Sequence, residues 1–414
     1  MNLYLKSPPY YCILVAGVFT YGQGTEARGL KHYLRDRAVW RFLRFLLTPW
    51  LRLKFRGRFE TVREKGPCLV VANHLTDWDP LLLACGFPRH MYFIASEHIF
   101  RWGLPSRLLR FLVDPISRLK GGTAVDTAGV ILRRLKQGAS ICLFAEGDRS
   151  WTGLTEPMHP TTGRLARMSG VTLITYRLEG GYLASPRWAG SSLRRGRMAG
   201  HVAGIYPAAT LRAMSAEEVS RLIERDLHED AWARQREAPV AYRGKNLAEH
   251  LERLLCLCPA CHELDALHSE GNYLRCSCGL TARFTTYGFL EGDNLPYDNL
   301  HDWTRWQDAA LAARFDAADG APLFADSEIA LTEILPDHGK RALGTDNLTF
   351  HPDRLTWRDM VFPLSAISGI SLLSGQTMQL GFGRAHYELT SVQIRCLRKY
   401  MTVYEHAKSR TREP

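Results

Sequence analysis

The 414-residue sequence predicts a mixed α/β sheet with flanking helices, followed by a cysteine-rich module and a small β-barrel closed by a C-terminal helix. In the first half of the chain, short apolar runs alternate with stretches of helical spacing, which is typical of helices packed on a sheet. A cluster of cysteines comes next, and several short strand-like runs fill the last third. At roughly 150 residues a domain, a chain of this length holds two or three domains.

The predicted sheet of the first half contains apolar strands separated by helical patterns. The strands are expected at residues 68–72, 91–95, 140–145 and 171–176, with a helix around 130–136. Farther along, Ser215 and Glu218 form a capping box at the start of another helix. Because the run 235–243 contains a proline and few large apolar residues, we expect this domain to span residues 61–235. In such sheets the chemistry lies at the strand ends.

The last third of the chain contains short strand-like runs that end in a helical pattern. The runs cover residues 329–335, 347–351, 354–357, 367–373, 378–382 and 386–389, and the helical pattern covers 391–406. Several strands separated by turns and followed by one helix predict a small β-barrel domain at residues 326–410. In the order of its elements this domain resembles the pleckstrin-homology (PH) or GRAM type.

The chain is basic, with 53 Lys and Arg against 42 Asp and Glu, a net charge of +11 and a pI near 9.2. This excess predicts an anionic partner, which includes nucleic acid, phospholipid headgroups and phosphorylated substrates. The basic residues concentrate at 28–58, where ten Lys or Arg accompany a single acidic residue, Asp36.

Within this basic stretch, residues 33–55 combine arginines with Trp, Phe and Leu at helical spacing. A basic helix with aromatic residues on its apolar side can lie in the headgroup region of an anionic leaflet. The same pattern suits an amphipathic helix packed on its own domain with solvated arginines, and the sequence leaves both interpretations open. Pro49 is expected to kink or end the helix. We assign residues 1–60 to an N-terminal segment that associates with the anionic membrane surface.

An apolar run at residues 10–19 is about half as long as the roughly 20 residues that a membrane-spanning helix needs. No small-residue cleavage site follows it, so the run does not fit a secretory signal. We therefore expect a cytoplasmic protein, bound peripherally to the inner face of the membrane.

A histidine and an aspartate follow the first predicted strand, in the run Asn73-His74-Leu75-Thr76-Asp77-Trp78-Asp79-Pro80. Histidine is the natural general base near neutral pH, and a carboxylate can hold its ring in the required tautomer. On one continuous helix His74 and Asp79 would point about 140° apart, so they can meet only across an irregular turn. With Pro80 at the first helical position, Asp79 becomes the expected N-cap. Asp77 remains an alternative partner, and an ordinary loop histidine beside a helix cap fits the same residues.

A second motif follows the strand predicted at 140–145 and reads Phe144-Ala145-Glu146-Gly147-Asp148-Arg149-Ser150. It is a glycine turn that presents a glutamate and an arginine, and arginine suits bidentate phosphate binding. Together with His74 and Asp79, this motif resembles the glycerolipid acyltransferase family, whose hallmark is H-x4-D followed by F-P-E-G-T-R-S. The resemblance covers about residues 65–210.

The resemblance implies a reaction and its substrates. His74 would deprotonate an acceptor hydroxyl while Asp79 orients the ring, and the hydroxyl would attack an acyl thioester directly, without an acyl-enzyme. The donor would be acyl-CoA or acyl carrier protein. The acceptor would be a lysophospholipid, with 1-acylglycerol-3-phosphate favoured by the family and phosphatidic acid as its product.

The resemblance also implies a site for the acceptor. Arg149, with Glu146 and Gly147, would bind its glycerol phosphate, and a short block that ends at Arg118 resembles a further family motif and supplies a second phosphate ligand. Asp148 stands where the family usually has threonine, which places an extra negative charge beside this site. The identity of the acceptor therefore stays open.

The cysteine cluster contains two close pairs separated by fourteen residues, Cys258 with Cys261 and Cys276 with Cys278. Clustered thiols in a reducing compartment indicate metal binding, and four thiolates in this arrangement suit a tetrahedral zinc ion with a structural role. The segment looks like a zinc ribbon, which we expect at residues 245–295. Cys256 is the spare thiol, and His262 and His268 are weaker candidate ligands.

Two other classes of function are compatible with parts of this pattern. A zinc ribbon in a basic chain often indicates nucleic-acid binding. Residues 257–281, however, contain a single basic residue, Arg275, against three acidic ones, so we expect no nucleic-acid partner. A lipid-binding or partner-docking protein without catalysis is the second alternative, and the presence of both motifs favours the enzyme.

Overall fold

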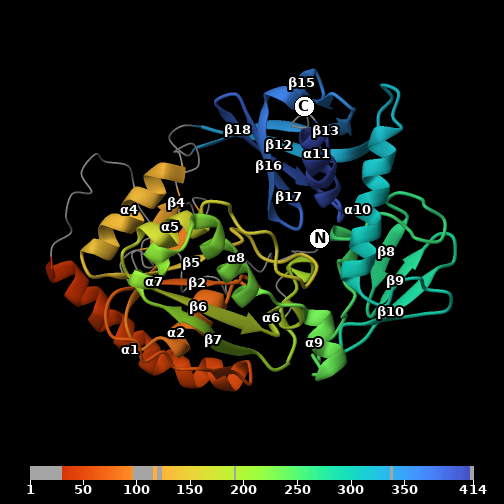
Figure 1. Cartoon of the computed structure of the whole chain (residues 1–414). Coiled ribbons are helices and arrows are strands. Elements are labelled where there is room, and N and C mark those ends of the chain that lie inside the picture. Colours follow the sequence, from red (N-terminus) through yellow and green to blue (C-terminus); the bar gives the residue numbers. More distant parts are fainter. Residues whose placement is uncertain (1–29, 97–114, 119–123, 191–192, 336–338, 411–414) are drawn as a thin grey trace, which may run out of the picture. The chain divides into compact units, whose positions relative to one another are not determined.

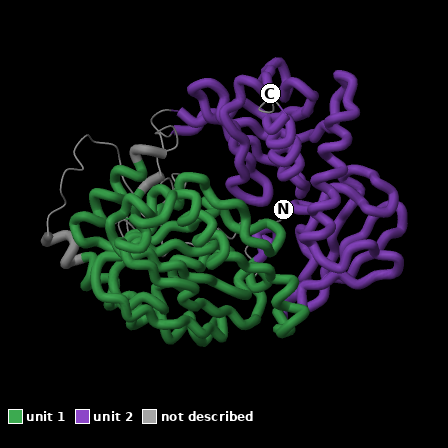
Figure 2. The backbone as a smooth tube through the Cα atoms, in the orientation of Figure 1, with its two compact units in different colours: residues 1–185, 193–242 green, residues 186–192, 243–414 purple. Residues whose placement is uncertain are grey.

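The computed structural model describes residues 30–96, 115–118, 124–190, 193–335 and 339–410. The chain divides into two compact units, each with its own contacts (Figure 2). Unit 1 contains residues 1–185 and 193–242, and unit 2 contains residues 186–192 and 243–414.

In the described part of unit 1, seven strands form one sheet in the order β1-β7-β6-β2-β5-β3-β4 (Figure 1). Their bounds are Arg58–Phe59 (β1), Cys68–Ala72 (β2), Met91–Ser96 (β3), Ile116–Arg118 (β4), Ser140–Phe144 (β5), Thr172–Glu179 (β6) and Ala199–Tyr206 (β7). Neighbouring strands run parallel except β6 and β7, which pair antiparallel. The mixed α/β sheet is confirmed, and the four predicted strands are β2, β3, β5 and β6.

Four helices share a core with one face of this sheet: α4 (Ala124–Lys136), α5 (Thr162–Met168), α7 (Ala208–Ala213) and α8 (Ala216–Leu227). Residues Leu69 and Val71 of β2 pack in this core with Ile223 of α8. Strands buried on both faces read as continuous apolar runs, which is why β2 and β5 were visible in the sequence. The capping box is also confirmed, since Ser215 and Glu218 exchange side-chain and main-chain hydrogen bonds at the start of α8.

Helix α1 (Leu30–Lys54) packs against α2 (Asp79–Gly86). The guanidinium of Arg44 donates to the carbonyls of Ala84 and Cys85, at 3.0 and 3.3 Å, and so satisfies free carbonyls at the end of α2. Trp40 and Leu51 are buried on the same side of α1. The helix includes Pro49 and continues to Lys54, so the proline does not end it as one alternative had it.

The opposite face of α1 carries large apolar side chains that remain exposed. They are Phe42, Phe45, Leu46, Trp50 and Leu53, and their spacing places them on one side of the helix. One face of the helix therefore packs on its own domain while the other is both apolar and open. No helix in the described ranges is long and apolar enough to cross a membrane.

Unit 2 begins with the cysteine-rich module, a sheet of short antiparallel strands in the order β11-β10-β9-β8. Its strands are Leu267–Glu270 (β8), Tyr273–Cys276 (β9), Thr281–Phe284 (β10) and Leu290–Glu291 (β11). Helix α10 (Leu300–Asp316) follows and was not predicted. Its signal was present, because Asn299 caps the helix by accepting from Asp302 N at 2.9 Å and alanines fill its second half.

The last part of unit 2 is an antiparallel sheet in the order β15-β14-β13-β12-β18-β17-β16. Its strands are Phe324–Ile334 (β12), Lys340–Phe350 (β13), Arg354–Trp357 (β14), Met360–Pro363 (β15), Ile367–Ser374 (β16), Thr377–Phe382 (β17) and Ala385–Ser391 (β18). Since β15 and β16 are the two edges of this order, the sheet is a curled half-barrel rather than a closed barrel. Helix α11 (Arg398–Arg410) follows it, beginning later than the predicted residue 391.

Buried ion pairs hold the parts of unit 2 together. Lys399 of α11 is fully buried and pairs with Asp326 of β12 at 3.0 Å and with Asp265 of the cysteine-rich module. Arg398 forms a bidentate pair with Asp308 of α10, with both distances 2.7 Å. These contacts link α11 to α10, to β12 and to the cysteine-rich module.

Candidate active site

The candidate site lies at the carboxyl end of β2, where the chain leaves the sheet. Asn73 is buried there, and its side-chain amide bonds to the backbone of β6, where the backbone of β2 no longer pairs with it. Its Nδ2 donates to the Leu178 carbonyl at 2.9 Å, and its Oδ1 accepts from Leu178 N at 2.7 Å. The next residue, His74, therefore lies in the loop that follows the strand. Asn73 was not predicted as a site residue, although it directly precedes the histidine.

Asp79 is fully buried and lies beside the ring of His74, with 2.9 Å between Oδ2 and Nδ1. The same carboxylate accepts from the main-chain N–H of Leu75 at 2.6 Å and of Thr76 at 2.8 Å, and from the Thr76 hydroxyl at 2.6 Å. The irregular turn expected between His74 and Asp79 is therefore present. A carboxylate held by this many donors has one fixed orientation toward the imidazole.

The expectation that Asp79 is the N-cap of the following helix is wrong by one position. Helix α2 begins at Asp79 itself, with Trp78 flanking it and Pro80 as its second residue. The side chain of Asp79 accepts from the loop before the helix instead of from the first turn of the helix. This backward orientation is what brings the carboxylate to His74.

The ring of His74 stacks on Phe144 of β5, with 4.2 Å between ring centroids and 17° between ring planes. An ionised carboxylate only accepts hydrogen bonds, so its contact with Nδ1 places the proton on Nδ1 and the lone pair on Nε2. Nε2 has no hydrogen-bond partner among the described residues, and the side chain is 20% exposed. The histidine is thus held on one side and accessible on the other, as a general base must be.

The second motif follows β5 and reaches the first through its main chain. Gly147 adopts a positive φ of 72°, which turns the chain at the strand end. Glu146 Oε1 accepts from His74 N at 2.6 Å, and Ser150 N donates to the His74 carbonyl at 3.0 Å. Burial raises the pKa of the Glu146 carboxyl to about 8. The two motifs therefore form one cluster of loops.

Arg149 contributes a positive charge to this cluster and pairs with Asp77, with 3.0 Å between Nη1 and Oδ2. The aspartate that had been an alternative partner for His74 is thus engaged with the arginine, and Asp79 takes the histidine. Arg118 is the last residue of β4, opposite Ser96 of β3, and its side chain lies outside the described part of the structure. Because β4 and β5 both run parallel to β3, Arg118 ends its strand at the same edge of the sheet as His74 and Glu146.

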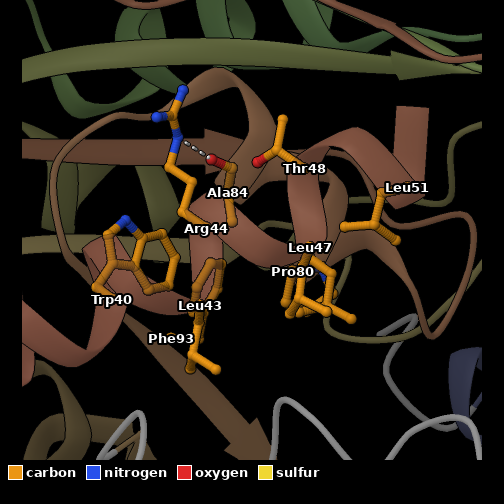
Figure 3. A pocket seen from close by; sticks show the side chains of 10 residues that line it. Trp40, Leu43, Arg44, Leu47, Thr48, Leu51, Pro80, Ala84 and Phe93 are labelled. Carbon is orange, nitrogen blue, oxygen red and sulfur yellow. Dashed lines mark hydrogen bonds between the residues drawn. The ribbon is translucent and has the colours of Figure 1, made fainter. Parts of the chain in front are cut away.

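A separate apolar pocket lies between α1 and α2 (Figure 3). It is lined by Trp40, Leu43, Arg44, Leu47, Thr48, Leu51, Pro80, Leu81, Ala84 and Phe93. Figure 3 shows Arg44 bonded to the Ala84 carbonyl at one side of it. At about 100° of rotation per residue, Pro80 and Leu81 point away from Asp79. The pocket is therefore distinct from the histidine site.

Residues 52–179 match the family model described as Acyltransferase. The chain thus contains an acyltransferase domain. The matched residues include His74, Asp79, Arg118 and the second motif. Among solved structures, the 1-acyl-sn-glycerophosphate (LPA) acyltransferase PlsC from Thermotoga maritima is similar over 51% of this chain and 84% of that chain, at 18% identity and a TM-score of 0.40.

Outside the acyltransferase domain, unit 2 brings together the cysteines predicted to bind metal: Cys258, Cys261, Cys276 and Cys278. Their sulfur atoms all lie within 4.8 Å of one another, with Cys258 and Cys278 at 3.8 Å and Cys261 and Cys276 at 3.6 Å. A tetrahedral zinc ion with bonds of about 2.3 Å separates its sulfur ligands by about 3.8 Å, so the cluster fits this metal.

Two tight turns present these cysteines. His262 N donates to the Cys258 carbonyl at 2.9 Å, and Gly279 N donates to the Cys276 carbonyl at 3.0 Å. Gly279 has a φ of 98°, which a residue with a side chain rarely adopts. Cys256 is buried elsewhere and donates its N–H to Gln307 of α10 at 2.7 Å. It does not belong to the group of four.

Proposed function

We propose that the acyltransferase domain transfers a fatty acyl group from acyl-CoA or acyl carrier protein to the hydroxyl of a lysophospholipid. We take 1-acylglycerol-3-phosphate as the preferred acceptor and phosphatidic acid as the product. The observation that carries the proposal is the contact between His74 and Asp79, which fixes the proton on Nδ1 and leaves Nε2 accessible. The family match over residues 52–179 supports the type of reaction.

In the proposed mechanism, His74 Nε2 takes the proton of the acceptor hydroxyl as its oxygen attacks the thioester carbonyl. The new C–O bond forms, the C–S bond breaks, and the imidazolium returns the proton to the departing sulfur. Asp79 stabilises the imidazolium and keeps the ring in one tautomer, as a triad carboxylate does. The stack on Phe144 limits rotation of the ring, so the base stays aimed at the hydroxyl.

The proposed phosphate ligands of the acceptor are Arg149 and Arg118. Arg149 is charged, 17% exposed and adjacent to the histidine loop, and a guanidinium matches the geometry of phosphate oxygens. In sequence, the exposed Gly147 lies between Arg149 and Glu146, and Glu146 is the residue that accepts from His74 N. A phosphate at this position would hold the free hydroxyl of the glycerol near Nε2.

The four-cysteine cluster is proposed to hold a structural zinc ion. All four ligands are thiolates, so no coordination position is left for substrate or water, and the ion would serve to fold the ribbon. The strands of this module are only two to four residues long, and metal binding would add to the free energy of folding of so small a sheet.

The open face of α1 is proposed to bind the membrane that holds the acceptor. Its exposed Phe, Trp and Leu side chains can enter the acyl boundary, while the exposed Arg37, Arg41 and Arg52 suit anionic headgroups. The half-barrel, which resembles the PH or GRAM type in the order of its elements, is proposed to contribute membrane recognition or substrate gating. Together these features support a peripheral position on the inner face of the membrane.

The experiment that tests the function supplies the purified chain with labelled acyl-CoA or acyl carrier protein and a panel of lysolipids. Acylated products are identified by mass spectrometry. We expect the fastest transfer to 1-acylglycerol-3-phosphate. If the protein binds lysolipid vesicles but acylates no acceptor from either donor, the proposal is wrong and a lipid-binding protein without catalysis becomes the better account.

A further inference from the structure

Both carboxylate oxygens of Glu146 accept hydrogen bonds from the main chain. Oε1 accepts from His74 N at 2.6 Å and Oε2 accepts from Glu156 N at 2.7 Å. Both distances are shorter than the usual 2.9 to 3.0 Å of an N–H···O bond. Two main-chain amides, one on each oxygen, therefore fix the position of this carboxylate.

The Glu146 carboxylate bonds to the main chain of the catalytic histidine and not to its ring. His74 N is held by Glu146, and the His74 carbonyl is held by Ser150 N at 3.0 Å. Asp79 and Phe144 then fix the imidazole. The backbone of residue 74 is therefore tied on both sides to the second motif, which is some seventy residues away in sequence.

We infer that Glu146 is a positioning residue, which aims His74 by holding its main chain and does not bind the acceptor. The inference rests on the proposed function, since it assigns a role to Glu146 within that site. It replaces the expectation that Glu146 helps Arg149 to bind phosphate.

The cost of this carboxylate argues for a specific role. Glu146 is largely shielded from water, and the negative charges of Glu156 and Asp79 raise its pKa further. A buried carboxylate is costly unless hydrogen bonds compensate it. Two amides that point at one side chain need two acceptor oxygens. Glutamate supplies both, whereas glutamine supplies one oxygen and one N–H₂ group.

The test compares wild type with Glu146→Gln in steady-state kinetics and in hydrogen exchange of the peptides that cover residues 72–79. Glu60→Gln is the matched control, because Glu60 also accepts a main-chain N–H, from Val202 at 2.9 Å, at the far edge of the same sheet. If Glu146→Gln does not fold, Glu146→Asp takes its place, since the shorter side chain keeps the carboxyl group but cannot span both amides.

We expect kcat of Glu146→Gln to fall about tenfold to a hundredfold, since small misplacements of a catalytic group have effects of this size. KM for the acceptor should stay within about twofold, and residues 72–79 should exchange faster. Glu60→Gln should change neither quantity. A raised acceptor KM with unchanged kcat would overturn the inference and return Glu146 to the acceptor site. Unchanged hydrogen exchange at residues 72–79 would show that Glu146 does not hold the main chain of His74. If wild type acylates nothing, the proposed function fails, while the hydrogen-exchange data still show whether Glu146 holds the main chain of His74.

Discussion

Arg149 carries the charge that the proposed acceptor needs, and Asp77 competes for that charge. The pair is 3.0 Å long, and the Asp77 side chain is 49% exposed. Exposed pairs contribute about 0.2 to 1 kcal/mol, so Asp77→Asn should lower KM for lysophosphatidate by at most about fivefold and leave kcat unchanged. Initial rates at varied acceptor concentration measure this. A higher KM in Asp77→Asn would mean that Asp77 itself binds the acceptor.

The ionisation of Glu146 should be visible in the stability of unit 1. Burial raises the pKa of this carboxyl to about 8 from its usual 4.5. Between these two values the folded protein keeps a proton that the unfolded chain releases, so the free energy of unfolding falls as pH rises through this window. Denaturant unfolding at several pH values should show the decline in wild type and a weaker one in Glu146→Gln. Parallel pH profiles of the two proteins would contradict this origin.

At the residue scale, the sequence revealed types of residue better than their contacts. The spacing of His74 and Asp79 was readable, as was the need for an irregular turn between them. The partner of Asp77 and the bonds of Glu146 were not, because each joins two motifs that are far apart in the chain. The helix start was misplaced by one residue because Asp79 accepts from the loop behind it, which no local pattern records.

Among the elements, the cysteine-rich module offers the clearest test of a cofactor. We expect one zinc ion per chain by elemental analysis, and its loss in Cys276→Ser. Cys256→Ala should keep the metal, since Cys256 lies outside the cluster. Removing the metal with a chelator should speed hydrogen exchange in β8, β9 and β10, because the small module loses its main source of stability. A metal-free wild-type protein with a protected ribbon would contradict the assignment.

Helix α1 offers the test of membrane binding. Phe45 and Leu53 are 76% and 82% exposed, and serine at both positions should weaken binding to anionic vesicles by about tenfold or more. Met168→Ser with Ile205→Ser changes two exposed apolar residues elsewhere on unit 1 and serves as the control. Vesicle sedimentation at low and high salt measures the apolar and the electrostatic contributions to binding. Equal binding of the two double variants would place the membrane contact elsewhere.

The predicted elements differ from the observed ones where burial is partial. Strands β2, β3, β5 and β6 are continuous apolar runs and were found. Strand β7 alternates small and half-exposed residues, β1 has two residues and β4 three, so their patterns are weak. In the half-barrel, all six predicted runs are strands, and β15 was missed because its four residues follow directly after a short turn.

At the scale of the whole molecule, two compact units combine the sheet of the acyltransferase domain with a cysteine-rich module and a half-barrel. The division into residues 1–60, 61–235, 245–295 and 326–410 stays a prediction about how the chain folds. Within unit 2, the buried Lys399 links the cysteine-rich module to the half-barrel, so these two regions are expected to unfold together.

The central claim concerns His74, and one measurement tests it most directly. Purified wild type, His74→Ala and His228→Ala are compared for the rate of acyl transfer from a thioester to 1-acylglycerol-3-phosphate, with His228 as an exposed histidine of the same unit. The account predicts that His74→Ala loses a factor of about 10² to 10⁴ while His228→Ala keeps the wild-type rate. A His74→Ala protein that is folded and transfers acyl groups as fast as wild type would contradict it.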